Sequence, residues 1–419
     1  MSDNFVKIAL LGCGTVGSEV INLLRSNHEQ ISERAGTNIV IKRVLVRDVS
    51  KNRGIHEIVF TEKIDDVLND PELDIVVEVM GGVEPAYKYV MEAIGRLKHI
   101  VTANKALLSE KMREIFRKAE ENRVDVYLEA SVGGGIPVIQ ALHDGLAPDK
   151  IKRVTGIVNG TTNYILTRME KNGLNFEGAL REAQEKGFAE ADPSFDINGV
   201  DSAQKLSILT AIAFRKHVNY REIVTQPLKD VDLSVIENVA KYFASSVRYL
   251  AVSELLENGS LNFIVAPFII GGDHPLASVR ENYNSIYIEG DYCRKTMLFG
   301  EGAGGRPTAN AVVSDIIYIS RNIVRGVAGK VPSVILPKEK ENKIGEAKKL
   351  YEYYFNIPSL IGSSVQIMST LQEHEIEIEL LLKTESGIIV KTGLCCSEDI
   401  RRALRICDGS QDCKLIRFY

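Results

Sequence analysis

The chain has 419 residues, of which 45% are hydrophobic and 26% charged, and its formal net charge is −5. This is the composition of an ordinary globular protein with room for two or three domains. The weak negative charge gives no basic footprint for nucleic acid or for an anionic membrane surface. No apolar run approaches the ~18 residues of a membrane span. We therefore expect neither nucleic acid nor a membrane as a partner.

The start of the chain and the spacing of its cysteines predict a cytoplasmic protein. The first residues enter a strand pattern without a leader-like segment. The six cysteines form no CxxC pair and no zinc-ligand spacing. Free thiols in a reducing, cytoplasmic environment are therefore expected.

The beginning of the chain predicts a dinucleotide-binding loop. A strand pattern over 6–11 leads into a GxGxxG motif, and a helix pattern follows over 18–25. In that setting the glycines allow a tight turn that brings backbone N–H groups against a pyrophosphate. The alternative is a Gly-rich turn without a ligand. The predicted cofactor-binding residues of this loop are Gly12, Gly14, Thr15, Val16 and Gly17.

The second strand, expected over 39–46, ends in Arg47 and Asp48. At this place an acid binds the ribose 2′-hydroxyl of NAD, whereas an arginine accommodates the 2′-phosphate of NADP. Because Arg47 comes first and Lys51 and Arg53 follow, we favour NADP over NAD. The alternative is a loop of solvated charges.

Alternating strands and helices continue the first domain. Strands are expected over 75–79, 99–102 and 124–128, and helices over 84–97 and 109–122. This order predicts a parallel, doubly wound sheet whose ligands bind beyond the carboxyl ends of the strands. Thr102 and Lys105 fall at such an end. Lys105 is thus a candidate active-site cation, with a solvated loop lysine as the alternative.

A glycine run at 129–137 interrupts the alternation. Backbone carbonyls in such a turn, with the Glu129 carboxylate, would suit a hard cation that prefers oxygen ligands. A domain hinge is the other interpretation, and spacing alone favours the hinge.

The stretch 183–205 collects acids in a segment broken by Gly and Pro, then enters an apolar helix. Asp201 is expected to be the N-cap of that helix, and Lys205 lies in its first turn. A charge at the start of a buried helix is costly unless it is paired or used. The stretch is therefore a candidate site, with a solvated acidic loop as the alternative.

These motifs together resemble the homoserine dehydrogenase family. The stretch 183–205 matches the family signature at every defined position, and residues 12–17, 101–105, 129–137 and 159–164 are similar to it in the same order. The resemblance covers roughly residues 5–325. It implies the NAD(P)-dependent interconversion of L-homoserine and L-aspartate 4-semialdehyde, in threonine and methionine biosynthesis.

The fold that we expect is α/β. A Rossmann-type domain would span 1–130 and be completed by a helix at about 306–328, and an α+β domain for substrate binding and dimerisation would span 131–305. A homodimer or homotetramer is expected. The resemblance also implies a structural sodium ion, which replaces the hinge interpretation. Its ligands would be the Glu129 side chain and the carbonyls of Val132, Gly134 and Ile136.

The resemblance assigns roles in the reaction. It implies that Lys205 donates a proton to the aldehyde oxygen and that Lys105 is also essential. Glu190 and Asp201 would bind the amino-acid end of the substrate, whose ammonium group needs carboxylates, and Asp196 would line the site. The further residues implied to approach the cofactor are Thr102, Lys105, Gly187, Glu190 and Gly302. Which lysine delivers the proton stays open.

The tail follows a charged linker at 338–344. Residues 345–419 predict the order βαββαβ, which resembles an ACT domain, a small module that binds amino acids and forms dimers. The turn at 357–362 lacks the Asp and the Pro-Gly pair usual after the first ACT strand. Inhibition by threonine and a purely structural role therefore both stay open.

Two other functions compete with this interpretation. Aspartate-semialdehyde dehydrogenase handles the same aldehyde but needs a nucleophilic cysteine, and neither Cys13 nor Cys293 is well placed. A non-catalytic sensor of NAD(P) and amino acids is the other alternative. The presence of both Lys105 and Lys205 argues against it.

Overall fold

The structure is a computed structural model that describes residues 5–51, 53–54, 58–331, 334, 349–357, 364–384, 387–405 and 413–419. The chain forms two compact units. The first unit comprises Met1–Val154, Ala203–Ile223 and Asn284–Asn342, and the second comprises Thr155–Ser202, Val224–Tyr283 and Lys343–Tyr419. The predicted linker at 338–344 lies outside the described residues.

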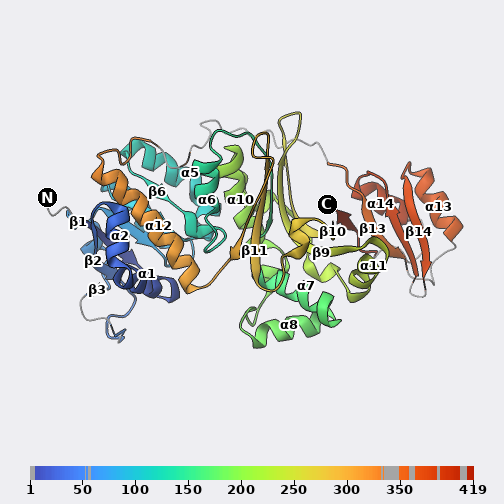
Figure 1. Ribbon diagram of the computed structural model, residues 1–419, viewed down its shortest axis with the longest axis horizontal. Helices are drawn as coiled ribbons and strands as arrows, with labels where there is room; N and C mark the ends of the chain where they lie inside the picture. Colours follow the sequence, from blue (N-terminus) through green and yellow to red (C-terminus); the bar gives the residue numbers. More distant parts are fainter. Residues whose placement is uncertain are drawn as a thin grey trace. The chain divides into compact units, whose positions relative to one another are not determined.

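The first unit is built on a six-stranded sheet with the order β3-β2-β1-β4-β5-β6, drawn mainly in blue in Figure 1. Every neighbouring pair in it is parallel, which confirms the predicted doubly wound sheet. The strands are β1 (Phe5–Leu11), β2 (Asn38–Leu45), β3 (Val59–Thr61), β4 (Ile75–Glu78), β5 (His99–Thr102) and β6 (Val126–Tyr127).

Helices from distant parts of the chain cover this sheet. The last of them, α12 (Gly305–Val324), packs on α1 (Thr15–Ser26), as Figure 1 shows for the orange and blue helices. Val312 and Ile316 of α12 share one buried cluster with Ile8 of β1 and Ile21 of α1. The other helices of this unit are α2 (His28–Ala35), α3 (Asp65–Leu68), α4 (Ala86–Gly95), α5 (Lys105–Asn122) and α6 (Val138–Gln140), with short turns η1 (Glu129–Ser131), η2 (Ala141–Gly145) and η3 (Tyr220–Glu222).

Three elements carry the chain across the boundary between the units: β7 (Ile151–Ile157), α10 (Val200–Phe214) and β11 (Tyr283–Gly290). Residues 201–211 of α10 are all buried, as its apolar sequence predicts. β12 (Lys295–Glu301) neighbours β11 in the first unit. One expectation was wrong: α10 begins at Val200, so Asp201 lies in its first turn and is not its N-cap.

The second unit is organised by a mixed sheet, which agrees with the predicted α+β domain. Its longest strands, β9 (Ser245–Leu255) and β10 (Leu261–Gly271), pair antiparallel, whereas β8 (Val224–Thr225) runs parallel to β10. The remaining elements before the tail are α7 (Gly160–Asn172), α8 (Phe176–Glu185), α9 (Ser194–Ile197), η4 (Leu228–Asp230), α11 (Leu233–Phe243) and η5 (Pro275–Ser278).

The tail adopts the predicted order βαββαβ, with its own apolar core around Phe355, Ile367 and Ile400. Its last strand also runs parallel to β10, so the tail extends the same sheet. Among the described residues, none of the helices is long and apolar enough to cross a membrane. The tail elements are β13 (Tyr353–Ile357), α13 (Ser364–Glu373), β14 (Ile378–Thr384), β15 (Gly387–Thr392), α14 (Ser397–Leu404) and β16 (Ile416–Phe418).

Candidate active site

The glycine loop follows β1 directly and has the backbone that its motif predicts. Gly12 has a φ of +107°, and a Cβ there would lie 2.9 Å from the Val79 carbonyl oxygen. A Cβ on Gly17 would lie 2.5 Å from the Gly12 carbonyl oxygen. α1 then begins at Thr15, and no side chain caps its N-terminus. The loop therefore leaves room for an anion at the N–H groups that begin the helix.

Arg47 and Asp48 lie exposed beyond the carboxyl end of β2. The Asp48 carboxylate accepts hydrogen bonds from the hydroxyl and the backbone N–H of Ser50, at 2.6 and 2.8 Å. The hydrogen bond from the Ser50 hydroxyl lowers the pKa of Asp48 the most, and the bond from the Ser50 N–H lowers it further. The acid is thus engaged within its own loop, while Arg47 stands beside it at the same edge of the sheet.

The carboxyl ends of β4 and β5 are joined by a buried polar network around Glu78. Its carboxylate accepts from the Thr102 hydroxyl at 2.7 Å, from the Met80 N–H at 2.8 Å and from the Asn104 amide at 3.3 Å. Glu78 is fully buried, and burial raises its pKa. The available sequence signal was a glutamate within the apolar run 75–79, but Glu78 was not among the predicted site residues.

Lys105 opens α5, four residues before the helix that the sequence predicts. The reason is Asn104, whose side-chain oxygen accepts the Leu107 N–H at 3.0 Å and caps the helix. Lys105 is therefore held at a helix start on the carboxyl edge of the sheet. The predicted cofactor residue Thr102 lies fully buried in the same turn.

The glycine run after β6 folds around a buried carboxylate. Both Glu129 oxygens accept backbone N–H groups, from Ile139 at 2.9 Å and from Gln140 at 2.7 Å. The Glu129 N–H in turn donates to the Asp315 carboxylate at 2.8 Å. Burial raises the pKa of Glu129 to about 7, and burial also raises the pKa of Asp315 well above its ordinary value.

The predicted cation ligands Val132, Gly134 and Ile136 are buried, and they follow Glu129 closely in the sequence. Gly134 has a φ of +56°, and a Cβ there would lie 2.5 Å from the carbonyl carbon of Gly302. The glycine run and the predicted cofactor residue Gly302 are therefore in close contact. Among the described residues, no group of three or more His, Cys, Asp or Glu side chains is placed to hold a metal ion.

In the second unit, one asparagine gathers two of the predicted substrate ligands. The Asn159 amide donates to the Asp196 carboxylate at 2.7 Å and to the Asp201 carboxylate at 2.8 Å. Its side-chain oxygen caps α7 by accepting the Thr162 N–H at 2.9 Å. The sequence motif contains Asn159, but no pattern indicated this bridge.

The remaining residues of the acidic stretch form an exposed turn. Gly187, with a φ of +75°, and Glu190 are both exposed in the loop between α8 and α9. Gln184 donates to the Glu190 carbonyl at 3.1 Å. Asp192 accepts the Ser194 N–H at 3.0 Å, which shapes the turn and lowers the pKa of the acid.

Asp201 and Lys205 belong to the same helix and lie one turn apart, which puts them on one face of α10. Both are buried, with 2% and 8% of their surface exposed. The helix thus carries a carboxylate that belongs to the acid cluster of the second unit and, on the same face, a buried amine.

Comparison with known proteins agrees with these motifs. The family model for homoserine dehydrogenase matches residues 137–317, and the model for the NAD-binding domain of homoserine dehydrogenase matches residues 12–129. The chain is 35% identical to homoserine dehydrogenase of Bacillus subtilis over 383 residues, which cover 90% of this chain and 87% of the relative. It is 41% identical to that of Synechocystis over 319 residues, or 75% and 73% of the two chains.

The chain belongs to the homoserine dehydrogenase family.

Solved structures support this at the level of the whole fold. The crystal structure of a homoserine dehydrogenase from Thiobacillus denitrificans superposes with a TM-score of 0.92 at 34% identity, covering 99% of this chain and 98% of that one. The crystal structure of S. aureus homoserine dehydrogenase at pH 7.5 superposes with a TM-score of 0.80 at 34% identity, covering 99% of each chain. Homoserine dehydrogenases are NAD(P)-dependent oxidoreductases, and the matched models include the NAD-binding domain, so the predicted activity is confirmed. Its substrates are L-homoserine and L-aspartate 4-semialdehyde.

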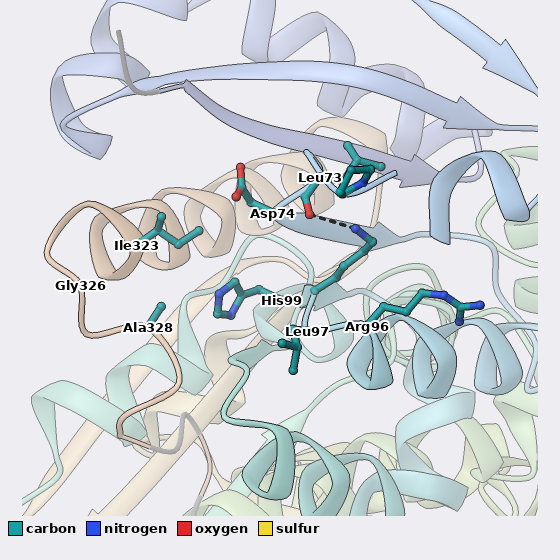
Figure 2. Close-up of a pocket in the computed structure, with 10 residues that line it drawn as sticks. Leu73, Asp74, Arg96, Leu97, His99, Ile323, Gly326 and Ala328 are labelled. Atoms are coloured by element: carbon teal, nitrogen blue, oxygen red, sulfur yellow. Dashed lines mark hydrogen bonds between the residues drawn. The ribbon is translucent and has the colours of Figure 1, made fainter. Parts of the chain in front are cut away.

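A cavity of about 560 Å³ lies away from all of these homoserine dehydrogenase motifs. It opens at the amino ends of β4 and β5, between Asp74, Arg96 and His99 (Figure 2). Ile323 in the last turn of α12 and Gly326 just beyond that helix complete this side of the lining. None of the predicted site residues lines it. Because ligands of such sheets bind at the carboxyl ends, we do not assign this cavity to the reaction.

Proposed function

We propose that the reduction of L-aspartate 4-semialdehyde uses Lys205 as the proton donor and Lys105 as a second cation at the reacting carbonyl. The observation that carries this proposal is that Lys205 is a buried amine one helical turn from Asp201, a carboxylate fixed by Asn159. A hydride added to the aldehyde carbon leaves negative charge on oxygen, which a lysine ammonium stabilises and protonates.

The acids of the second unit would bind the α-ammonium of the substrate. Asp201 and Asp196 share the Asn159 amide, so both carboxylates are held in place before the substrate arrives. Glu190, exposed on its loop, would complete the set and approach the nicotinamide half together with Gly187. Preorganised carboxylates reduce the cost of ordering the substrate.

The cofactor would lie along the carboxyl edge of the first sheet. Gly12 and Gly17 leave the space that a pyrophosphate needs, which a Cβ would fill, and Gly14, Thr15 and Val16 begin α1 there. Nicotinamide supplies the hydride. NADP is our preferred cofactor, because Arg47 is exposed just beyond β2, where an arginine would accommodate a 2′-phosphate, and Asp48 is engaged with Ser50. A structure of a related archaeal homoserine dehydrogenase, 26% identical, is in complex with NADPH.

A sodium ion would be held by Glu129 with the carbonyls of Val132, Gly134 and Ile136. The donor set fits a hard monovalent cation, because it consists of oxygens and has one carboxylate with lone pairs beyond the two N–H groups that it accepts. The cation would hold the glycine run that contacts Gly302.

We also propose that the chain is a cytoplasmic homodimer or homotetramer and that the tail is an ACT-like module. The five cysteines that the structure describes are free, which suits a reducing compartment. The order βαββαβ suits an ACT-like module, which would bind threonine or serve only in assembly. Turnover with NADH and with NADPH, each with and without threonine, tests cofactor choice and regulation together.

The test of the proton donor is Lys205→Ala. We expect kcat to fall by about 10²–10⁴-fold, because general acid catalysis contributes that much, while NADPH still binds. Ser207→Ala is the matched control, since it removes a buried hydrogen bond of the same helix, to the Gln204 carbonyl. Near-normal turnover of Lys205→Ala would remove Lys205 from the mechanism.

A further inference from the structure

Glu78 occupies the point of the first sheet where two functional turns meet. It is the last residue of β4, and its register partners are Leu11 of β1 and Thr102 of β5. Leu11 immediately precedes the glycine loop, and Thr102 immediately precedes the turn that leads to Lys105. Its carboxylate therefore lies at the position where the strand order reverses and where such sheets bind their ligands.

The carboxylate accepts hydrogen bonds at the start of two turns, the one that follows β5 and the one that follows β4. On the β5 side, the Thr102 hydroxyl donates to Glu78 at 2.7 Å and accepts the Asn104 N–H at 3.1 Å. On the β4 side, the Met80 N–H donates to Glu78 at 2.8 Å and begins the turn that contains Gly82. One buried group thus fixes the backbone on both sides of the strand pair.

Asn104 connects the two turns to the start of α5. Its amide nitrogen donates to Glu78 at 3.3 Å and to the Gly82 carbonyl at 2.6 Å, and its oxygen caps the helix at Leu107. Lys105 is the next residue in the chain. The Asn104 amide, which caps α5 beside Lys105, is thus held by two acceptors, the Gly82 carbonyl and the Glu78 carboxylate.

Core packing alone does not explain a carboxylate at this position. Glu78 is 0% exposed, and a buried charge is costly unless its hydrogen bonds are complete. An aliphatic side chain would fill the same space in the strand IVVE at a lower cost. The hydrogen bonds of Glu78 instead fix the geometry of the turns after β4 and β5. A fixed geometry is what residues that position reacting groups must provide.

We propose that Glu78 is a positioning residue of this dehydrogenase, which holds Lys105 in its working place by locking the Thr102–Asn104 turn to the Gly82 turn. The inference rests on the proposed role of Lys105. A displacement of about 1 Å of a reacting group costs about 10²-fold in rate. The carboxylate itself needs no contact with the substrate or the cofactor for this effect.

The experiment is a double-mutant cycle of Glu78→Gln and Lys105→Ala. Glu78→Gln keeps the size of the side chain but turns an N–H₂ group toward donors that need an acceptor. We expect kcat to fall by about 10- to 100-fold, with the Kd for NADPH, measured by its fluorescence, changed by less than about threefold. In the Lys105→Ala background the same change should cost less than about threefold.

The controls separate positioning from loosening of the sheet. Lys98→Met removes a buried charge at the other ends of the same strands and should lower the melting temperature without lowering kcat. If Glu78→Gln does not fold, Thr102→Val cuts the same link and should give the same non-additive loss with Lys105→Ala.

Two results overturn the inference: near-normal kcat of a folded Glu78→Gln protein, or losses that add within about twofold in the cycle. If instead Lys105→Ala keeps full turnover while Glu78→Gln loses it, the proposed role of Lys105 fails, and Glu78 acts through another group.

Discussion

Strands β4 and β5 place a buried charge at each of their ends, and the two charges have opposite signs. At the carboxyl ends, the Glu78 carboxylate collects O–H and N–H donors. At the amino ends, the Lys98 amine donates to the carbonyls of Asp70 and Leu73 at 2.6 and 3.1 Å. The bond to the Leu73 carbonyl is the dashed line in Figure 2. Burial raises the pKa of Glu78 and lowers that of Lys98.

The polarity of the backbone explains this difference. Chains that leave the carboxyl end of a parallel strand run into helix N-termini, which present N–H groups, so an acceptor is needed there. At the amino ends the turn before β4 presents carbonyls, so a donor is needed. Both charges satisfy turns, but only the turns at the carboxyl ends lead to Lys105. The amino edge therefore has a cavity and a stabilising lysine, whereas the carboxyl edge is where we propose that the reaction takes place.

Among the changes at the two edges of the parallel sheet, the largest effect is expected from removing the Lys105 cation at the carboxyl edge. Lys105→Ala should lower kcat by about 10²-fold or more, because a preorganised cation is lost from the developing negative charge. Its melting temperature should change little, since the side chain is only half-buried. Steady-state kinetics and thermal melting check this. A Lys105→Ala variant with wild-type kcat would contradict a catalytic role for the carboxyl edge of these strands.

A second effect concerns Glu129, which follows β6 at the same edge. Its pKa rises from 4.5 to about 7 on folding, so the folded state holds the proton longer than the unfolded state does. The free energy of unfolding should therefore fall by about 3 kcal/mol as the pH rises from 4.5 to 7 in sodium-free buffer.

The measurement is chemical denaturation of the wild type and of Glu129→Gln across this pH range, with sodium and with choline. Glu129→Gln should lose most of the slope. Sodium should reduce the slope of the wild type, because a bound cation stabilises the carboxylate. Equal curves in sodium and choline would count against the proposed cation site.

Much of this arrangement could be predicted from the sequence, because strand, glycine turn and helix follow one another with standard spacing. The start of α5 could not, because the cap at Asn104 competes with the apolar pattern that begins later. Asp201 was predicted as a cap, yet the helix starts one residue before it and its carboxylate is bonded to Asn159. Contacts such as this one join residues far apart in the chain, and a single sequence gives no signal for them.

The smallest effect is expected at the amino edge. Lys98→Met leaves the Asp70 and Leu73 carbonyls without their buried donor, which should cost about 1–3 kcal/mol of unfolding free energy. The kinetic constants for both substrates should stay at the wild-type values. A loss of turnover comparable with that of Lys105→Ala would mean that the two ends of these strands are coupled.

The packing of α12 on α1 has a consequence for biosynthesis. Val312 and Ile316 complete the cluster that contains Ile8 and Ile21, although they are among the last residues of the first unit to leave the ribosome. Until α12 has been translated, this part of the nascent sheet and α1 lack their apolar cover. A truncated chain that ends before α12 should therefore require chaperones or aggregate, even though it contains all six strands of the parallel sheet.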